Sequence, residues 1–216
     1  MKITGVETVQ VGEFGNLVWV RLYTDEGLIG LGETFRNPEA TVAYVHETCA
    51  PYLIGKDPLC REARMRELSA KVGNHFNGFP TRSVEVRGNS AIDIALWDIA
   101  GKAAGLPVWR LLGEPVRDAV IPYASLLPPG PDFETFKASM IDWALRAQAL
   151  GFRAAKLEPL VNGPYRHDAL DEPDDRITEI VAGVRSAVGP DMALMVDVGY
   201  AWDDVDRAER VLRDWA

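Results

Sequence analysis

Long apolar runs, basic clusters and cysteines are scarce in this 216-residue sequence. No apolar stretch reaches the roughly 20 residues of a membrane-spanning helix, so we expect no membrane segment. The first residues lead straight into a predicted strand, which is not typical of a signal peptide. With 23 basic and 32 acidic residues the net charge is −9, which argues against binding to nucleic acid. The two cysteines, Cys49 and Cys60, favour reduced thiols in a cytoplasmic protein.

The composition that remains is that of an ordinary soluble globular protein. Hydrophobic residues make up 47% of the chain and charged residues 25%, and no low-complexity segment interrupts them. The length suits one large or two small domains. The negative net charge does not exclude an anionic substrate, because local charges dominate inside a cleft.

Residues 1–115 are predicted to form an α+β unit, in which an antiparallel meander over residues 2–34 precedes several helices. Asn37 and Pro38 resemble an N-cap with proline at the first helical position, so a helix is expected from there to about Leu53. A further helix is expected over residues 59–72. Ser90 and Asp93 resemble a capping box, which predicts the start of the longest helix there.

Residues 116–216 follow a different pattern, in which short apolar strands alternate with amphipathic helices. Strands are predicted over residues 120–125, 154–158 and 193–197, and helices over 133–150, 174–188 and 202–215. Such alternation predicts parallel strands with right-handed crossovers. Three βα units begin a TIM-type barrel without closing it, because a complete barrel needs about 200 residues or more.

Charged residues lie where two of these strands end. The strand over residues 154–158 ends on Lys156 and Glu158, and the strand over 193–197 ends on Asp197, two residues before Gly199. Side chains two apart on a strand point the same way, so Lys156 and Glu158 share one face. Barrels of this type build their active sites from the carboxyl ends of successive strands. The pattern therefore predicts the beginning of an active site.

Several motifs together resemble the mandelate racemase and muconate lactonising branch of the enolase superfamily. The resemblance covers essentially the whole chain and is most specific over residues 90–113; its motifs are the Gly-Leu-Gly-Glu of 30–33, the Leu-Ile-Gly-Lys-Asp-Pro of 53–58, and the segments 90–102 and 106–113. It implies an N-terminal capping domain over a (β/α)7β barrel, here incomplete. It also implies an essential Mg²⁺, a small carboxylate substrate and a homo-oligomer in the full-length form.

The resemblance also suggests roles for the charged residues. The first metal ligand of the family matches Asp197. The alternative for Asp197 is a purely structural role as a helix N-cap. Of the Lys-x-Lys motif of the family, Lys156 matches and Glu158 does not. The other metal ligands and the opposite-face base come from later strands that have no counterpart in this sequence. With a single protein ligand, no tight metal binding by this chain alone is expected.

Lys156 has three interpretations: a base or electrostatic contact, a structural partner of Glu158, or the Schiff-base lysine of an aldolase-type barrel. Glu158 on the same face should keep Lys156 protonated, which favours a cationic residue that holds substrate. Glu158 itself suits an acid or base, a contact to a substrate hydroxyl, or only a partner of Lys156. Racemisation needs a base on each face of the carbon, so a lone glutamate fits a single-base reaction better.

Candidate substrate-binding residues lie in three predicted loops. Phe14 and Asn16 lie between the first two strands, His75 lies in an aromatic loop before the longest helix, and Tyr165 and His167 lie in a long βα loop. The family draws its specificity from loops in such places. For His75 a packing role is the main alternative, and the βα loop is equally suited to solvent or to an oligomer contact.

The resemblance implies Mg²⁺-dependent abstraction of the α-proton of a hydroxy-carboxylate, with a sugar-acid dehydratase (a lyase) as the first expectation. A racemase or cycloisomerase of the same family is the second. The chain as given is expected to be an N-terminal portion that is inactive alone. A rival is a non-catalytic truncated homologue that acts as an assembly or binding piece, since an unpaired strand edge favours association.

Overall fold

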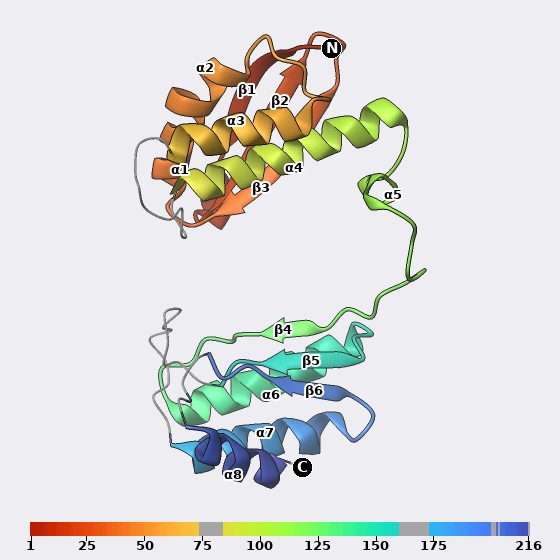
Figure 1. Cartoon of the computed structure of the whole chain (residues 1–216). Helices are drawn as coiled ribbons and strands as arrows, with labels where there is room; N and C mark the ends of the chain where they lie inside the picture. Colours follow the sequence, from red (N-terminus) through yellow and green to blue (C-terminus); the bar gives the residue numbers. More distant parts are fainter. Residues whose placement is uncertain (74–83, 160–172, 200–201, 203, 216) are drawn as a thin grey trace. The chain divides into compact units, whose positions relative to one another are not determined.

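The computed structural model describes residues 1–73, 84–159, 173–199, 202 and 204–215, and it divides into two compact units (Figure 1). The first unit comprises Met1–Val116 and the second comprises Arg117–Ala216. Each unit has a three-stranded sheet of its own and a separate hydrophobic core.

The sheet of the first unit is the predicted antiparallel meander. Its strands are β1 (Ile3–Val9), β2 (Leu17–Thr24) and β3 (Ile29–Phe35), with the short 3-10 helix η1 (Gly12–Phe14) between the first two. The turn between β2 and β3 contains Gly27 at φ +78°, a conformation that glycine adopts without strain. Val18, Val20 and Leu22 of β2 are fully buried, because successive side chains alternate between the two faces and these three meet the helices.

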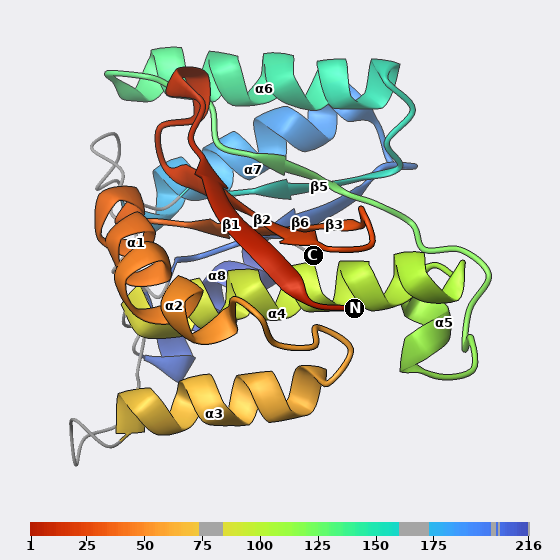
Figure 2. The same ribbon diagram turned by 90° about the horizontal axis from the view of Figure 1, so that it is seen from above.

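The helices of the first unit are α1 (Pro38–Tyr44), η2 (Val45–Cys49), α2 (Ala50–Leu53), α3 (Arg61–Gly73), α4 (Val84–Ala104) and α5 (Val108–Leu112). Most of them lie over one face of this sheet, whereas α5 follows α4 and contacts that helix. Figures 1 and 2 show α4 running along β3. This approach requires Gly30 and Gly32, because a Cβ at these positions would lie 2.2 Å from the Ala95 carbonyl oxygen and 1.8 Å from that of Ala91.

The helix expected from Pro38 to Leu53 is present, but its central five residues, η2, form a π-helical turn. Pro51 accounts for the irregularity, because it has no N–H to donate to the carbonyl four residues before it. Asn37 occupies the predicted N-cap position before Pro38, at φ +46°, although its side chain makes no capping hydrogen bond.

The predicted start of the longest helix is wrong. Helix α4 begins at Val84, and Ser90 lies inside it, where its hydroxyl donates to the carbonyl of Val86. Asp93 accepts a hydrogen bond from Arg61 of α3 at 2.8 Å instead of closing a capping box. The guanidinium of Arg61 also lies 4.3 Å from the ring centroid of Trp97, so these contacts hold α3 against α4.

The second unit begins the expected α/β barrel. Its elements are β4 (Ala124–Leu126), α6 (Phe133–Ala149), β5 (Ala154–Leu157), α7 (Asp174–Val188), β6 (Ala193–Val196) and α8 (Val205–Trp215). The strands are parallel in the order β4-β5-β6, and Figure 1 shows the helices on one side of them. Strand β4 begins later than predicted, because Pro122 has no N–H for a ladder and Val120 and Ile121 are exposed.

The core of the second unit lies between the sheet and its helices. Leu126, Ala155 and Leu157 of the strands pack there with Phe136 and Met140 of α6. Helix α8 is held to α7 by polar contacts at both ends. Arg207 donates to both carboxylate oxygens of Asp174, and the indole N–H of Trp215 donates to the hydroxyl of Thr178.

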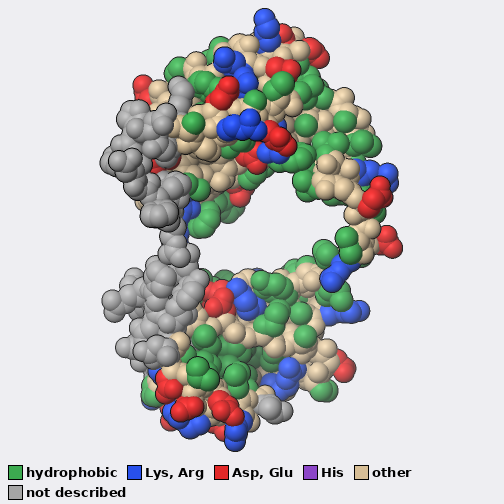
Figure 3. Space-filling model, viewed as in Figure 1, with side chains coloured by type: hydrophobic (Ala, Val, Ile, Leu, Met, Phe, Trp, Pro, Cys, Tyr) green, Lys and Arg blue, Asp and Glu red, His purple; other side chains and the backbone are tan. Residues whose placement is uncertain are grey.

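Charged side chains of both signs are interspersed over each unit on the face seen in Figure 3. A continuous basic surface is therefore absent from the described part of that face. Among the helices in the described ranges, none is long and apolar enough to cross a membrane.

Candidate active site

Three charged side chains gather at the carboxyl ends of β5 and β6, on the face of the sheet opposite to α6 and α7. Along β5, Ala155 and Leu157 are fully buried against the helices, so Lys156 between them points the other way. Glu158 follows on the same face, and Asp197 comes directly after β6. The local alternation of small or apolar residues with charged ones thus produces a one-sided site.

The Lys156 ammonium lies between the two carboxylates. Its Nζ is 2.9 Å from Asp197 Oδ2 and 3.3 Å from Glu158 Oε1. The pairing with Glu158 was predicted from the strand period, whereas the closer contact with Asp197 joins neighbouring strands. The site is open to water, since the Asp197 side chain is 42% exposed.

Asp197 makes a second contact, in which its Oδ1 accepts the backbone N–H of Gly199 at 3.0 Å. Gly199 has φ +54°, so the chain turns sharply after the strand. Helix α8 starts only at Val205, and near its start Asp204 accepts the N–H of Asp206. Asp197 is therefore not the N-cap of α8, so the alternative structural role considered for this residue is excluded.

These contacts favour the charged forms of both partners. The hydrogen bond to Asp197 raises the pKa of Lys156 above its ordinary value, burial opposes this, and the contact with Glu158 adds to it. The same Lys156 contact lowers the pKa of Asp197, and the Gly199 N–H lowers it further. Lys156 is thus an ammonium at neutral pH, and a Schiff-base lysine or a free-amine base is not what this arrangement provides.

Ser125 of β4 and Tyr123, directly before that strand, also contact the cluster, and neither was predicted from the sequence. The hydroxyl of Ser125 donates to Glu158 Oε1 at 3.3 Å, and Lys156 Nζ lies 5.8 Å from the ring centroid of Tyr123. Tyr123 and Ser125 are two apart next to β5, and Ser125 pairs in register with Lys156. The two-residue period of the strand would have placed Tyr123 and Ser125 on the same face as Lys156, but only once the register of β4 and β5 was known.

The other predicted substrate-binding residues lie in the first unit or outside the described residues. Phe14, which is 51% exposed, and Asn16, whose carbonyl accepts the N–H of Arg36, belong to the first unit. His75, Tyr165 and His167 lie outside the described residues. Their proposed roles remain predictions.

The donor set can be compared with what Mg²⁺ requires. This ion takes six oxygen ligands, often one or two carboxylates together with waters. Within the described ranges no group of three or more His, Cys, Asp or Glu side chains is placed to hold a metal. Both Asp197 oxygens already have hydrogen-bond partners. The described residues alone therefore do not form a Mg²⁺ site, although Asp197 is suited to be one of several ligands.

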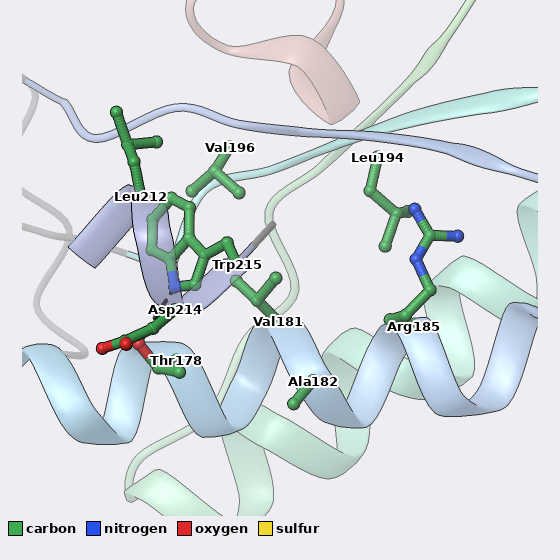
Figure 4. Close-up of a pocket in the computed structure, with 9 residues that line it drawn as sticks. All are labelled: Thr178, Val181, Ala182, Arg185, Leu194, Val196, Leu212, Asp214 and Trp215. Carbon is green, nitrogen blue, oxygen red and sulfur yellow. Dashed lines mark hydrogen bonds between the residues drawn. The ribbon is translucent and has the colours of Figure 1, made fainter. Parts of the chain in front are cut away.

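A cavity of about 380 Å³ lies on the opposite side of the sheet, between β6, α7 and α8 (Figure 4). Leu194 and Val196 of β6 line it, whereas Asp197 belongs to the other face. Its cation, Arg185, donates to the backbone carbonyls of Gly189 and Met192. The lining also includes Thr178 and Asp214, but it holds none of the charged groups at the strand ends, so the charged cluster is the better candidate site.

Known proteins resemble this chain in sequence and in fold. The model of the mandelate racemase / muconate lactonizing enzyme N-terminal domain matches residues 4–113. A D-galactonate dehydratase family member of Streptomyces bingchenggensis is 29% identical over 92% of this chain and 52% of its own length. A second such member, from a Marinomonas species, is 27% identical over 96% of this chain and 55% of its own length.

Solved structures match over nearly the whole chain. An enolase of the mandelate racemase subgroup from Agrobacterium tumefaciens is 36% identical over 98% of this chain and 53% of its own, with a TM-score of 0.73. The 3,6-anhydro-D-galactonate cycloisomerase of Zobellia galactanivorans is 26% identical over 99% and 55%, with a TM-score of 0.80. The chain thus spans about half the length of the relatives it matches.

A capping unit followed by parallel strands that end on lysine and carboxylates defines the enolase-superfamily class. Within that class, the chain belongs to the mandelate racemase / muconate lactonizing enzyme family. The expected fold, an N-terminal capping domain with a partial α/β barrel, is confirmed.

Proposed function

We propose that the protein, in a form long enough to close the barrel, is a dehydratase of sugar acids. One observation carries this proposal: at the strand ends, the ammonium of Lys156 lies within hydrogen-bonding distance of two carboxylates, those of Glu158 and Asp197. The names of the D-galactonate dehydratase family members support the substrate class. The 216-residue chain by itself is proposed to lack this activity.

Lys156 is proposed to hold the carboxylate of the substrate. Its ammonium already bridges two carboxylate groups, so an incoming substrate carboxylate replaces contacts of the same kind. As the α-proton leaves, negative charge grows on the carboxylate oxygens of the substrate, and a fixed ammonium stabilises that charge. The positive charge must be kept for this task, and the two neighbouring carboxylates keep it.

Glu158 is proposed as the base, because Lys156 has no free amine to offer. Its carboxylate takes the α-proton, and the electrons of the C–H bond pass into the enediolate of the substrate. The C–O bond at the β-carbon then breaks, and the departing hydroxide takes the proton from Glu158 and leaves as water. The resulting enol becomes a 2-keto-3-deoxy acid. One group on one face suffices for such a syn elimination.

Asp197 is proposed as one ligand of the Mg²⁺ that the superfamily generally uses, with the remaining ligands supplied by later strands. Isothermal titration of Mg²⁺ into the 216-residue chain should show no binding tighter than about 0.1 mM, since one carboxylate is a weak site. Tighter binding that Asp197→Asn removes would show that the chain holds the metal without further strands.

The dehydratase proposal is tested with a panel of sugar acids and the longest form of the protein made by its source, by assaying 2-keto-3-deoxy acid. Glu158→Gln should lower kcat by about 100-fold or more, the usual range for a lost acid–base group. Lys156→Met should be similarly damaging. The matched control is Asp191→Asn, an exposed residue at the amino end of β6, which should leave kcat unchanged. Equal activity of Glu158→Gln and wild type would exclude Glu158 as the base.

A cycloisomerase is the second candidate, favoured by the similarity to the Zobellia galactanivorans enzyme. The product separates the two reactions, because dehydration lowers the mass of the acid by one water and isomerisation leaves it unchanged. Mass spectrometry of each reaction in the panel therefore decides between them.

A further inference from the structure

We propose that Ser125 is a positioning residue that fixes the carboxylate of Glu158 for proton transfer. This inference rests on the proposed function and deepens it. The hydroxyl of Ser125 donates to Oε1 of Glu158, and the proposal assigns the proton transfer to the other oxygen, Oε2.

The backbone places Ser125 for this contact. Ser125 lies in register with Lys156 in the parallel β4–β5 pair, and the N–H of Glu158 lies 3.3 Å from the carbonyl oxygen of Leu126. The chain therefore brings Glu158 alongside the end of β4. Leu126 is buried against the helices, so its neighbour Ser125 points to the face of the sheet opposite to α6 and α7, where Glu158 also lies.

The two donors to Glu158 meet at one atom. Lys156 Nζ and Ser125 Oγ each lie 3.3 Å from Oε1. Rotation about the last torsion of a glutamate is otherwise broad and roughly two-fold, so a carboxylate without fixed donors samples many orientations. Two donors from two different strands limit that rotation.

Ser125 matters most when substrate binds. Lys156 is also bonded to Asp197 and turns to the substrate carboxylate in the proposed reaction, so its contact with Glu158 weakens at that moment. Ser125 carries no charge and does not compete for the substrate carboxylate as an ammonium does. Its hydroxyl then becomes the fixed donor that keeps the base oriented. A displacement of about 1 Å at a reacting group costs up to about 100-fold in rate.

The kinetic test compares Ser125→Ala with Ser125→Thr in the catalytically active form. Ser125→Ala should lower kcat by about 10-fold with little change in KM, and Ser125→Thr, which keeps a hydroxyl, should recover most of the rate. Ser186→Ala, an exposed serine on α7, is the matched control and should match wild type. An unchanged kcat in Ser125→Ala, a rise confined to KM, or no recovery in Ser125→Thr would each overturn the proposal.

A second measurement does not depend on activity. In the 216-residue chain with ¹³C-labelled glutamate, carbon–carbon three-bond couplings report the distribution of the χ1 and χ2 rotamers of Glu158, which carry its carboxylate to the hydroxyl of Ser125. The signals are assigned through Glu158→Gln. Ser125→Ala should broaden that distribution and Ser125→Thr should not. An unchanged distribution in Ser125→Ala overturns the positioning role even if no substrate is found, whereas an inactive wild type with an ordered Glu158 counts only against the dehydratase proposal.

Discussion

Lys102 of the first unit and Lys156 of the second make similar contacts, but the first has a structural role and the second lies in the candidate active site. Lys102 Nζ lies 2.7 Å from Asp98 and 2.6 Å from the carbonyl oxygen of Ile29. Lys156 Nζ lies 2.9 Å from Asp197 and 3.3 Å from Glu158. The contacts of Lys102 join helix α4 to strand β3. The contacts of Lys156, in contrast, are made with carboxylates that could bind a ligand or transfer a proton.

The surroundings of the two lysines explain the difference. Strand β3 is an edge strand of its sheet, so its outward N–H and C=O groups need partners. Asp98 accepts the N–H of Leu31, and Arg87 donates to the carbonyl of Phe35, so side chains of α4 pair with that edge. Around Lys156 the backbone groups are paired within the sheet, and the charged side chains remain available to a ligand.

The largest effect should come from breaking one of the two cores. Phe136 of the second unit is 2% exposed, so Phe136→Ala should cost about 3–5 kcal/mol. Because the two cores share no residue, amide hydrogen exchange should accelerate in β4–β6 and stay unchanged in β1–β3. Ile92→Ala, in the core of the first unit, is the reciprocal control. Equal acceleration in both sheets would show that the units unfold together.

The next effect tests the contact between α4 and β3. Gly32→Ala places a Cβ where the Ala91 carbonyl lies at 1.8 Å, so the helix must move away from the strand. We expect a loss of about 3 kcal/mol in the free energy of unfolding, measured by urea denaturation. Gly12→Ala is the matched control, because nothing lies within 4 Å of its Cβ. A loss below 1 kcal/mol would mean that α4 accommodates the methyl group easily.

The first unit also shows how far the sequence alone could lead. The meander and the end of the first helical segment at Leu53 were predicted, because strand alternation and helix signals are local. The start of α4 at Val84 was missed, since Ser90 and Asp93 imitate a local capping signal while their partners are Val86 and the distant Arg61.

The second unit gives the same lesson for the candidate site. Strand period placed Lys156 and Glu158 on one face, and α7 was predicted over the residues it occupies, ending before Gly189. The shorter contact between Lys156 and Asp197 depends on the register of β5 and β6, in which Lys156 pairs with Met195. Long-range packing sets that register, so neither this contact nor the one made by Ser125 could be read from local spacing.

A smaller effect concerns the paired edge of β3. Asp98→Asn removes the charge that holds Lys102 and weakens the acceptor of the Leu31 N–H, so we expect a loss of about 1 kcal/mol by urea denaturation. The control is Asp142→Asn on α6, whose pair with Arg146 is long, 3.8 Å, and highly exposed. That change should cost no more than about 0.3 kcal/mol. Equal losses would show that the contact with the edge strand adds nothing to an ordinary surface pair.

The smallest effect is the pH dependence of the Lys156–Asp197 pair. Because the pair is partly exposed, Asp197→Asn should change the free energy of unfolding by less than about 1 kcal/mol at neutral pH. The pKa of Asp197 is lowered in the folded state, so its contribution is present above the unfolded value near 4 and is lost as the pH falls below it. The pKa of Lys156 is raised, so its contribution is present below about 10.4 and is lost as the pH rises through the folded value. Urea denaturation of wild type and Asp197→Asn should therefore converge as the pH falls through the folded pKa of Asp197, which lies below about 4, and as it rises through the folded pKa of Lys156, which lies above about 10.4. A wild-type advantage that grows on acidification would contradict the pairing of Asp197 with the ammonium.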